Sequence, residues 1–123
     1  LVGPVLVAEA CLDSYVKAWE GLDSSAAAAL FSTDARYFET PYADAFFGRE
    51  GVEAYWQRVT ADQDRIVFES EVLAVTNNTG IARWSARFRS VSGNVDVELN
   101  GVFVLEFASS DQVQTLREWW HVR

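Results

Sequence analysis

The stretch Ile81-Ala-Arg-Trp-Ser-Ala-Arg-Phe-Arg-Ser-Val91, followed by Ser92-Gly-Asn94 and then Val95-Asp-Val-Glu-Leu99, decides the fold. Apolar side chains alternate with arginines in the first segment and with polar side chains in the second. Such alternation is typical of a strand with one buried face and one exposed face. Ser-Gly-Asn is a turn signal between them, so the stretch predicts an antiparallel hairpin. Its buried face carries Trp84, Ala86 and Phe88.

Strand patterns continue on both sides of this hairpin. Residues 65–76 are rich in β-formers and end in Asn77-Asn-Thr-Gly80, a strong turn signal. Residues 102–107 extend the second hairpin strand beyond Gly101, a plausible bulge or bend. Residues 113–122 form the last strand. We therefore expect four consecutive antiparallel strands in the C-terminal half, with arginines of residues 81–91 facing Asp96 and Glu98.

The N-terminal half reads as helices. Residues 7–21 place apolar side chains at spacings of three and four, and a capping residue at Asp23 or Ser24 starts a second helix through Phe31. A short strand at 36–40 leads through a loop at 41–48, whose adjacent phenylalanines either cover a cavity mouth or cap the core. A third helix follows at 49–59. Early helices and late strands predict an α+β fold, with helices covering one face of a curved antiparallel sheet.

Composition limits the possible functions. The 123 residues fit one domain, residues 1–123, and half of them are apolar. A net charge of -8 disfavours nucleic acid as a partner. One cysteine and one histidine give no intramolecular disulfide and no zinc site, and no glycine-rich phosphate loop is present, so neither metal nor cofactor is expected. No apolar run is long enough to span a membrane. Residues 1–8 lack signal-peptide features, so a cytoplasmic location is expected.

Five short stretches carry a resemblance to a known family. They are Tyr15-Val-Lys-Ala-Trp19, Leu30-Phe-Ser-Thr-Asp-Ala35, Gly48-Arg-Glu-Gly-Val52 with Tyr55-Trp56, Gly101-Val-Phe-Val-Leu-Glu-Phe107, and Leu116-Arg-Glu-Trp-Trp120. Over its whole length the chain resembles SnoaL-like domains of the nuclear transport factor 2-like superfamily, relatives of ketosteroid isomerases and polyketide cyclases. The resemblance implies a cone-like curved sheet wrapped around the N-terminal helices. It does not imply one chemistry, because the family includes isomerases, cyclases, dehydratases, epoxide hydrolases and non-catalytic proteins.

Comparison with ketosteroid isomerases implies positions for three functional groups. Tyr15 takes the place of a helical tyrosine that donates to an oxyanion. Glu39 takes the place of the carboxylate base, or Thr40 does if the prolines are aligned. The second oxyanion donor falls near Phe103, which cannot donate a hydrogen bond. The chain therefore departs from the steroid isomerase pattern, and we do not predict that activity.

The same alignment points Glu118 inward on the last strand and His121 outward. Glu39 and Glu118 in an apolar cone would raise each other's pKa, leaving one acid and one base, with Tyr15 donating to a developing oxyanion. The alternative is that Glu118 pairs with an arginine and Glu39 faces solvent. Aromatic residues that either contact substrate or belong to the core are Trp19, Trp56, Trp84, Phe88, Phe103 and Trp120.

These features favour an enzyme that performs cofactor-free acid–base chemistry on a small apolar compound: isomerisation, cyclisation, dehydration or hydration. One alternative is a non-catalytic protein that binds such a compound. Another is an interaction domain whose cone is filled by side chains. The outer face of the sheet carries Val102, Val104, Trp119 and His121, and family members commonly pair through this face, so a homodimer is expected.

Overall fold

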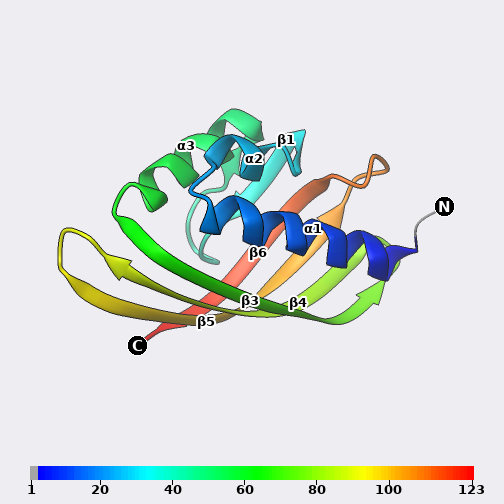
Figure 1. Cartoon of the computed structure of the whole chain (residues 1–123). Helices are drawn as coiled ribbons and strands as arrows, with labels where there is room; N and C mark the ends of the chain where they lie inside the picture. The colour runs from blue at the N-terminus through cyan, green and yellow to red at the C-terminus, as the bar shows by residue number, and fades with distance from the viewer. Residues whose placement is uncertain (1–2) are drawn as a thin grey trace.

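The computed structural model describes residues 3–123; Leu1 and Val2, which belong to the predicted domain 1–123, lie outside the described residues. Three helices lie on the concave side of a six-stranded sheet (Figure 1). The elements in chain order are α1 Pro4–Glu20, α2 Ser24–Ala28, β1 Phe31–Phe38, β2 Phe46–Phe47, α3 Gly48–Thr60, β3 Gln63–Thr76, β4 Thr79–Ser90, β5 Val95–Phe107 and β6 Val113–Val122. The predicted α+β fold is confirmed, and β2 is a two-residue addition to the predicted order.

Helix α1 buries one stripe of its surface against the sheet. Its buried residues are Ala8, Leu12, Tyr15, Ala18 and Trp19. The helix begins three residues earlier than predicted because Pro4 fits the first turn, where its missing N–H has no helical partner. It ends at Glu20, where the backbone N–H of Gly21 bonds to Lys17.

Helix α2 is shorter than predicted. Asp23 caps it by accepting a 2.9 Å bond from the Ala26 N–H, as its position suggested. The helix ends at Ala28, and Phe31 opens β1 rather than closing the helix. Strand β1 therefore begins five residues before the predicted start at Arg36.

The sheet has the strand order β2-β1-β6-β5-β4-β3. Four of its pairings are antiparallel, including the predicted hairpin of β4 and β5. The pairing of β1 with β6 is parallel, with Tyr37 beside Leu116, so the sheet is not antiparallel throughout. This pairing brings residues from the two halves of the chain together at the centre of the sheet.

Gly101 does not form the predicted bulge. The ladders run through it without a register shift, pairing it with Trp84 on β4 and Trp120 on β6. A Cβ placed there would lie 2.9 Å from Trp84 Cζ2 and 3.0 Å from Trp120 Cβ, and would contact the Trp119 carbonyl. Glycine is therefore required because the Trp119 carbonyl and the side chains of Trp84 and Trp120 approach this point of the strand.

The buried side chains form one connected cluster between the helices and the sheet. Much of it is aromatic, with Tyr15, Trp19, Phe68, Trp84 and Phe103 in mutual ring contact. Within residues 3–123, none of the helices combines the length and apolar character needed to cross a membrane.

Candidate active site

A cavity of about 340 Å³ lies between α1, α3 and the concave face of the sheet. Its walls are mostly aromatic and aliphatic, and its polar groups are two carboxyls, three tyrosine hydroxyls and the indole N–H groups of four tryptophans. The lining residues are Tyr15, Trp19, Tyr37, Glu39, Tyr55, Trp56, Val59, Trp84, Phe88, Val97, Leu99, Glu118, Trp120 and Val122. All the predicted site residues line this cavity except Phe103.

Phe103 does not line the cavity, although it was predicted to contact substrate. It is buried behind the wall, with its ring stacked on Trp84 at 5.2 Å between centroids and edge-on to Tyr15 at 5.5 Å. Trp84 is the larger ring and stands between Phe103 and the open space. Phe103 therefore supports the position of Trp84 and Tyr15.

Regular secondary structure places the aromatic walls. Tyr15 and Trp19 are one helical turn apart on α1, and the Trp19 indole N–H donates to Gln63 Oε1 at 2.8 Å. Trp84 and Phe88 lie on the inner face of β4 because side chains alternate along a strand. Trp120 on β6 donates its indole N–H to the Glu39 backbone carbonyl at 3.2 Å, which joins β6 to the end of β1.

Glu118 is the most buried carboxyl of the site, with 6% of its surface exposed. The Tyr37 hydroxyl donates to its Oε1 atom at 3.0 Å. Burial raises the pKa of Glu118 to about 8; the Tyr37 hydrogen bond opposes this rise, and the nearby charge of Glu39 adds to it. The alternative that Glu118 pairs with an arginine is not what the structure has, since its polar partner is a tyrosine. At neutral pH this side chain is mostly a carboxylic acid.

Glu39 lies one residue beyond β1 and is half-buried at the cavity wall. Of the two alternatives for the base position, Glu39 lines the cavity and Thr40 does not. Its charge contributes to the raised pKa values of both Glu118 and Tyr55. The two predicted carboxyls therefore share one cavity and differ in burial.

Sequence reasoning missed Tyr37 and gave Tyr55 no site role. Tyr37 is two residues before Glu39, so the alternation that points Glu39 inward also points Tyr37 inward. Its hydroxyl oxygen lies 3.4 Å from that of Tyr15. Burial raises the pKa of Tyr15 and of Tyr37 well above the ordinary value, so both remain neutral hydroxyls.

The two phenylalanines of the loop before α3 do not line the cavity. Phe46 stacks on Tyr55, with ring centroids 4.5 Å apart, and the Arg58 guanidinium lies 5.5 Å from its ring. Phe47 is exposed. Of the two alternatives for this loop, the contacts of Phe46 fit a cap on the core.

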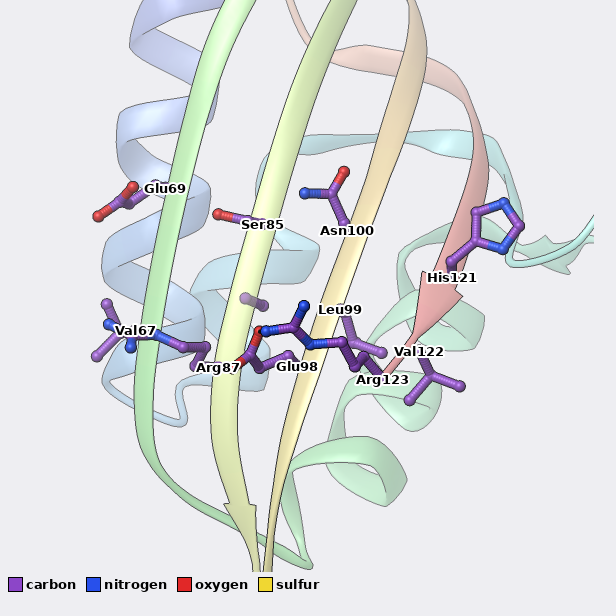
Figure 2. Close-up of a pocket in the computed structure, with 11 residues that line it drawn as sticks. Val67, Glu69, Ser85, Arg87, Glu98, Leu99, Asn100, His121, Val122 and Arg123 are labelled. Atoms are coloured by element: carbon purple, nitrogen blue, oxygen red, sulfur yellow. The ribbon is translucent and has the colours of Figure 1, made fainter.

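A second hollow of about 420 Å³ lies on the outer face of the sheet. Figure 2 shows Glu69, Ser85, Asn100 and His121 in a row across its strands. Arg123 and Glu98 form an ion pair at 3.4 Å in solvent. His121 lies on this face, as the alternation predicted. Charged side chains line this hollow, and it lacks the buried acid that distinguishes the inner cavity. The described residues also hold no cluster of His, Cys, Asp and Glu suited to a metal ion.

Comparisons with known proteins agree with this architecture. A family model for the SnoaL-like domain matches residues 12–114. A steroid Delta-isomerase of Nocardioides simplex is 26% identical over 112 residues, which span 91% of this chain and 88% of the relative. A putative isomerase from Bacillus subtilis has a TM-score of 0.84 at 16% identity, covering 98% of this chain and 90% of that one.

Another similar structure is that of SalBIII, an epoxide hydrolase/cyclase-like enzyme with a role in forming the pyran ring of the polyether salinomycin. It has a TM-score of 0.80 at 15% identity. The superposition covers 92% of this chain and 89% of that one. At such identities the structural likeness shows the fold and carries no statement about chemistry.

Proposed function

The chain belongs to the SnoaL-like domain family, and from this membership we propose that its inner cavity performs cofactor-free acid–base chemistry on a small apolar compound. The reaction class is isomerisation or cyclisation, with dehydration and hydration as related possibilities. The observation that carries the proposal is a buried carboxyl, Glu118, with a pKa of about 8, in one apolar cavity with a second carboxyl, Glu39.

The two carboxyls would take different roles because their environments differ. Glu118 is protonated at neutral pH and would donate a proton. Glu39 is half-buried and would remove a proton from a carbon beside a carbonyl, or activate a nucleophile. An acid and a base positioned in this way contribute roughly 10²- to 10⁴-fold each to a reaction rate.

The size of the cavity indicates the size of the substrate. An engineered protein cavity of about 150 Å³ binds benzene. The cavity here, about 340 Å³, is roughly twice as large. Indole and phenyl rings cover its walls, so a flat compound of two rings with an oxygen substituent fits its volume and chemistry.

One sequence relative supports this reaction class, because it is a steroid Delta-isomerase. The resemblance nevertheless places the second oxyanion donor of ketosteroid isomerases near Phe103, an apolar residue. We therefore propose an isomerase or cyclase whose donors are Glu118 and tyrosine.

The test begins with a thermal-shift screen of two-ring ketones, enones, phenols and epoxides. A ligand at 100 times its dissociation constant stabilises the fold by roughly 2.7 kcal/mol. Compounds that bind are then assayed for conversion by the native chain and by Glu39→Gln and Glu118→Gln. Each variant should lose at least about a hundredfold in rate while circular dichroism shows that it is still folded. Glu9→Gln on the exposed side of α1 is the matched control.

Unchanged conversion in both glutamine variants would reject these residues as catalytic. Binding without conversion would favour the alternative of a non-catalytic binding protein. No binding across the panel would favour the third alternative, an interaction domain.

We also propose that two copies of the chain pair through the outer face of the sheet. Trp119 is 47% exposed there, beside the half-buried Val102 with which it pairs across β5 and β6. An exposed indole among valines is a surface that association would cover.

A further inference from the structure

Tyr37 connects two residues of the candidate site. Its hydroxyl donates to Glu118 Oε1 at 3.0 Å and lies 3.4 Å from the hydroxyl of Tyr15. The three side chains come from β1, β6 and α1 and are 1%, 6% and 4% exposed. They form a line of three oxygens that is almost inaccessible to solvent, and all three side chains line the inner cavity.

The number of protons on these three oxygens determines which oxygen donates and which accepts in each hydrogen bond. A tyrosine hydroxyl has one proton to donate and lone pairs to accept with. When Glu118 is ionised, Tyr37 must donate to it, so the bond between the tyrosines is donated by Tyr15. The proton of Tyr15 is then held by the Tyr37 hydroxyl and is not available to a ligand. When Glu118 is protonated, the line can reverse: Glu118 donates to Tyr37, Tyr37 donates to Tyr15, and the Tyr15 proton is free for a ligand.

We propose that Tyr37 is a relay residue, which couples the protonation of Glu118 to the direction in which Tyr15 donates its hydrogen bond. The proposal rests on the proposed function and deepens it. Tyr15 donates to a ligand oxygen only when Glu118 carries a proton. The cavity therefore selects compounds with a carbonyl, alkoxide or phenolate oxygen at the Tyr15 end.

Proton transfer along this line balances without another reactant. The O–H bond of Glu118 breaks as one forms on Tyr37, the original O–H of Tyr37 breaks as one forms on Tyr15, and the Tyr15 proton passes to the ligand oxygen. Both tyrosines end neutral, and one proton has moved from Glu118 to the ligand. Tyr55 on α3, Glu39 after β1 and Cys11 on α1 are the other titratable groups that influence this line.

The test is a carboxyl ¹³C NMR titration of glutamate in the full, ligand-free chain, with the Glu118 signal assigned by Glu118→Gln. Tyr37→Phe should raise the midpoint of Glu118 by about one pH unit, because the carboxylate loses its donor. Tyr15→Phe should raise it in the same direction by about a tenth to a third as much, although Tyr15 does not touch Glu118. Phe68→Leu, at a core ring that contacts Tyr15 and does not line the cavity, should leave the midpoint unchanged.

A Tyr15→Phe midpoint equal to that of the native chain would overturn the relay and leave Tyr37 as a purely local partner of Glu118. If Tyr37→Phe fails to fold by circular dichroism, the comparison of Tyr15→Phe with Phe68→Leu decides alone. The titration needs no substrate. A changed Glu118 midpoint in a protein that converts no substrate would support the relay and reject the proposed enzymatic function. Substrate conversion without a changed midpoint would support the enzymatic function and reject the relay.

Discussion

Glu118 makes the stability of this protein depend on pH in a direction opposite to most carboxyls. Its folded-state pKa of about 8 lies above the ordinary value of 4.5, so the folded state binds the proton more tightly than the unfolded chain. The stability that Glu118 provides is therefore complete below about pH 4.5. It is lost as the pH rises through about 8 and changes little above that.

We expect Glu118→Gln to remove this dependence. Between pH 5 and pH 9 the native chain should lose roughly 3 to 5 kcal/mol that the variant retains, since glutamine cannot ionise. Urea denaturation at several pH values measures the difference, with Glu9→Gln as control. Equal slopes of stability against pH in the native chain and in Glu118→Gln would show that Glu118 is ionised at neutral pH.

Gly101 offers a residue-scale test of how the cavity wall is packed. An alanine there would press on Trp84 and Trp120 and contact the Trp119 carbonyl, on a strand whose ladders leave little room to shift. We expect Gly101→Ala to cost about 1–3 kcal/mol in urea denaturation. In the matched control, Gly93→Ala, the new Cβ meets neighbours at 3.5 Å, an ordinary contact, and should cost less. Equal losses in the two variants would contradict this account.

At the scale of elements, Asp62, two residues beyond the end of α3, is hydrogen-bonded to the hairpin of β4 and β5. Its carboxylate accepts from Ser90 Oγ at 2.8 Å, from the Ser92 N–H at 2.7 Å and from Ser92 Oγ at 2.8 Å. These bonds, the Ser90 bond first, lower the pKa of Asp62. The stabilisation is present at neutral pH and is lost as the pH falls through the lowered folded-state pKa.

Asp62→Ala should therefore loosen the start of the hairpin without unfolding the molecule. Hydrogen exchange of the Val91 and Ser92 amides should become faster at neutral pH, and Asp96→Ala, in the same hairpin, should leave it unchanged. Below the lowered pKa of Asp62 the native chain should exchange as the variant does. Unaltered amide exchange in Asp62→Ala at neutral pH would show that contacts other than those of Asp62 stabilise this part of the hairpin.

The elements also show what the sequence could predict and what it could not. The strong alternation in residues 81–99 predicted the hairpin and its inward face, because period-two patterning is a local signal. The arginines face the acids of β5 as expected, with Arg87 opposite Glu98 and Arg89 opposite Asp96. The ion pairs of Arg83 and Arg89 are nevertheless made with Glu71 and Asp64 on β3, which the sequence did not predict. A central strand has two neighbours, and its own sequence does not say which of them its side chains reach.

The candidate site was predictable to a similar extent. The family resemblance placed Tyr15, Glu118 and Trp120 at the cavity, and spacing on α1 put Trp19 on the same face as Tyr15. The hydrogen bond from Tyr37 to Glu118 joins residues 81 positions apart across a parallel pairing of β1 and β6. No local pattern encodes such a pairing, which is why the contact was missed although both residues lay in predicted strands.

At the scale of the whole molecule, the outer face of the sheet is the surface through which we propose that two copies of the chain associate. Light scattering at micromolar concentration should give twice the mass of one chain, and Trp119→Glu should give the mass of one, because a buried charge opposes association. Val5→Glu, a similarly exposed apolar site on α1, should leave the mass unchanged. A native chain that elutes as a single copy would reject the pairing.

The central place of β6 has a consequence for how the protein is made. It follows the other five strands in the chain, and it lies between β1 and β5 in the sheet. Until it is synthesised, β1 and β2 pair with none of β3, β4 and β5, and the edges of β1 and β5 that β6 covers have no partner. The nascent chain must then keep apolar strand faces in solution until β6 has been synthesised, a state in which chaperones commonly hold such chains. The acid of the cavity, Glu118, lies on that same strand, so the acid–base pair cannot form before β6 is synthesised.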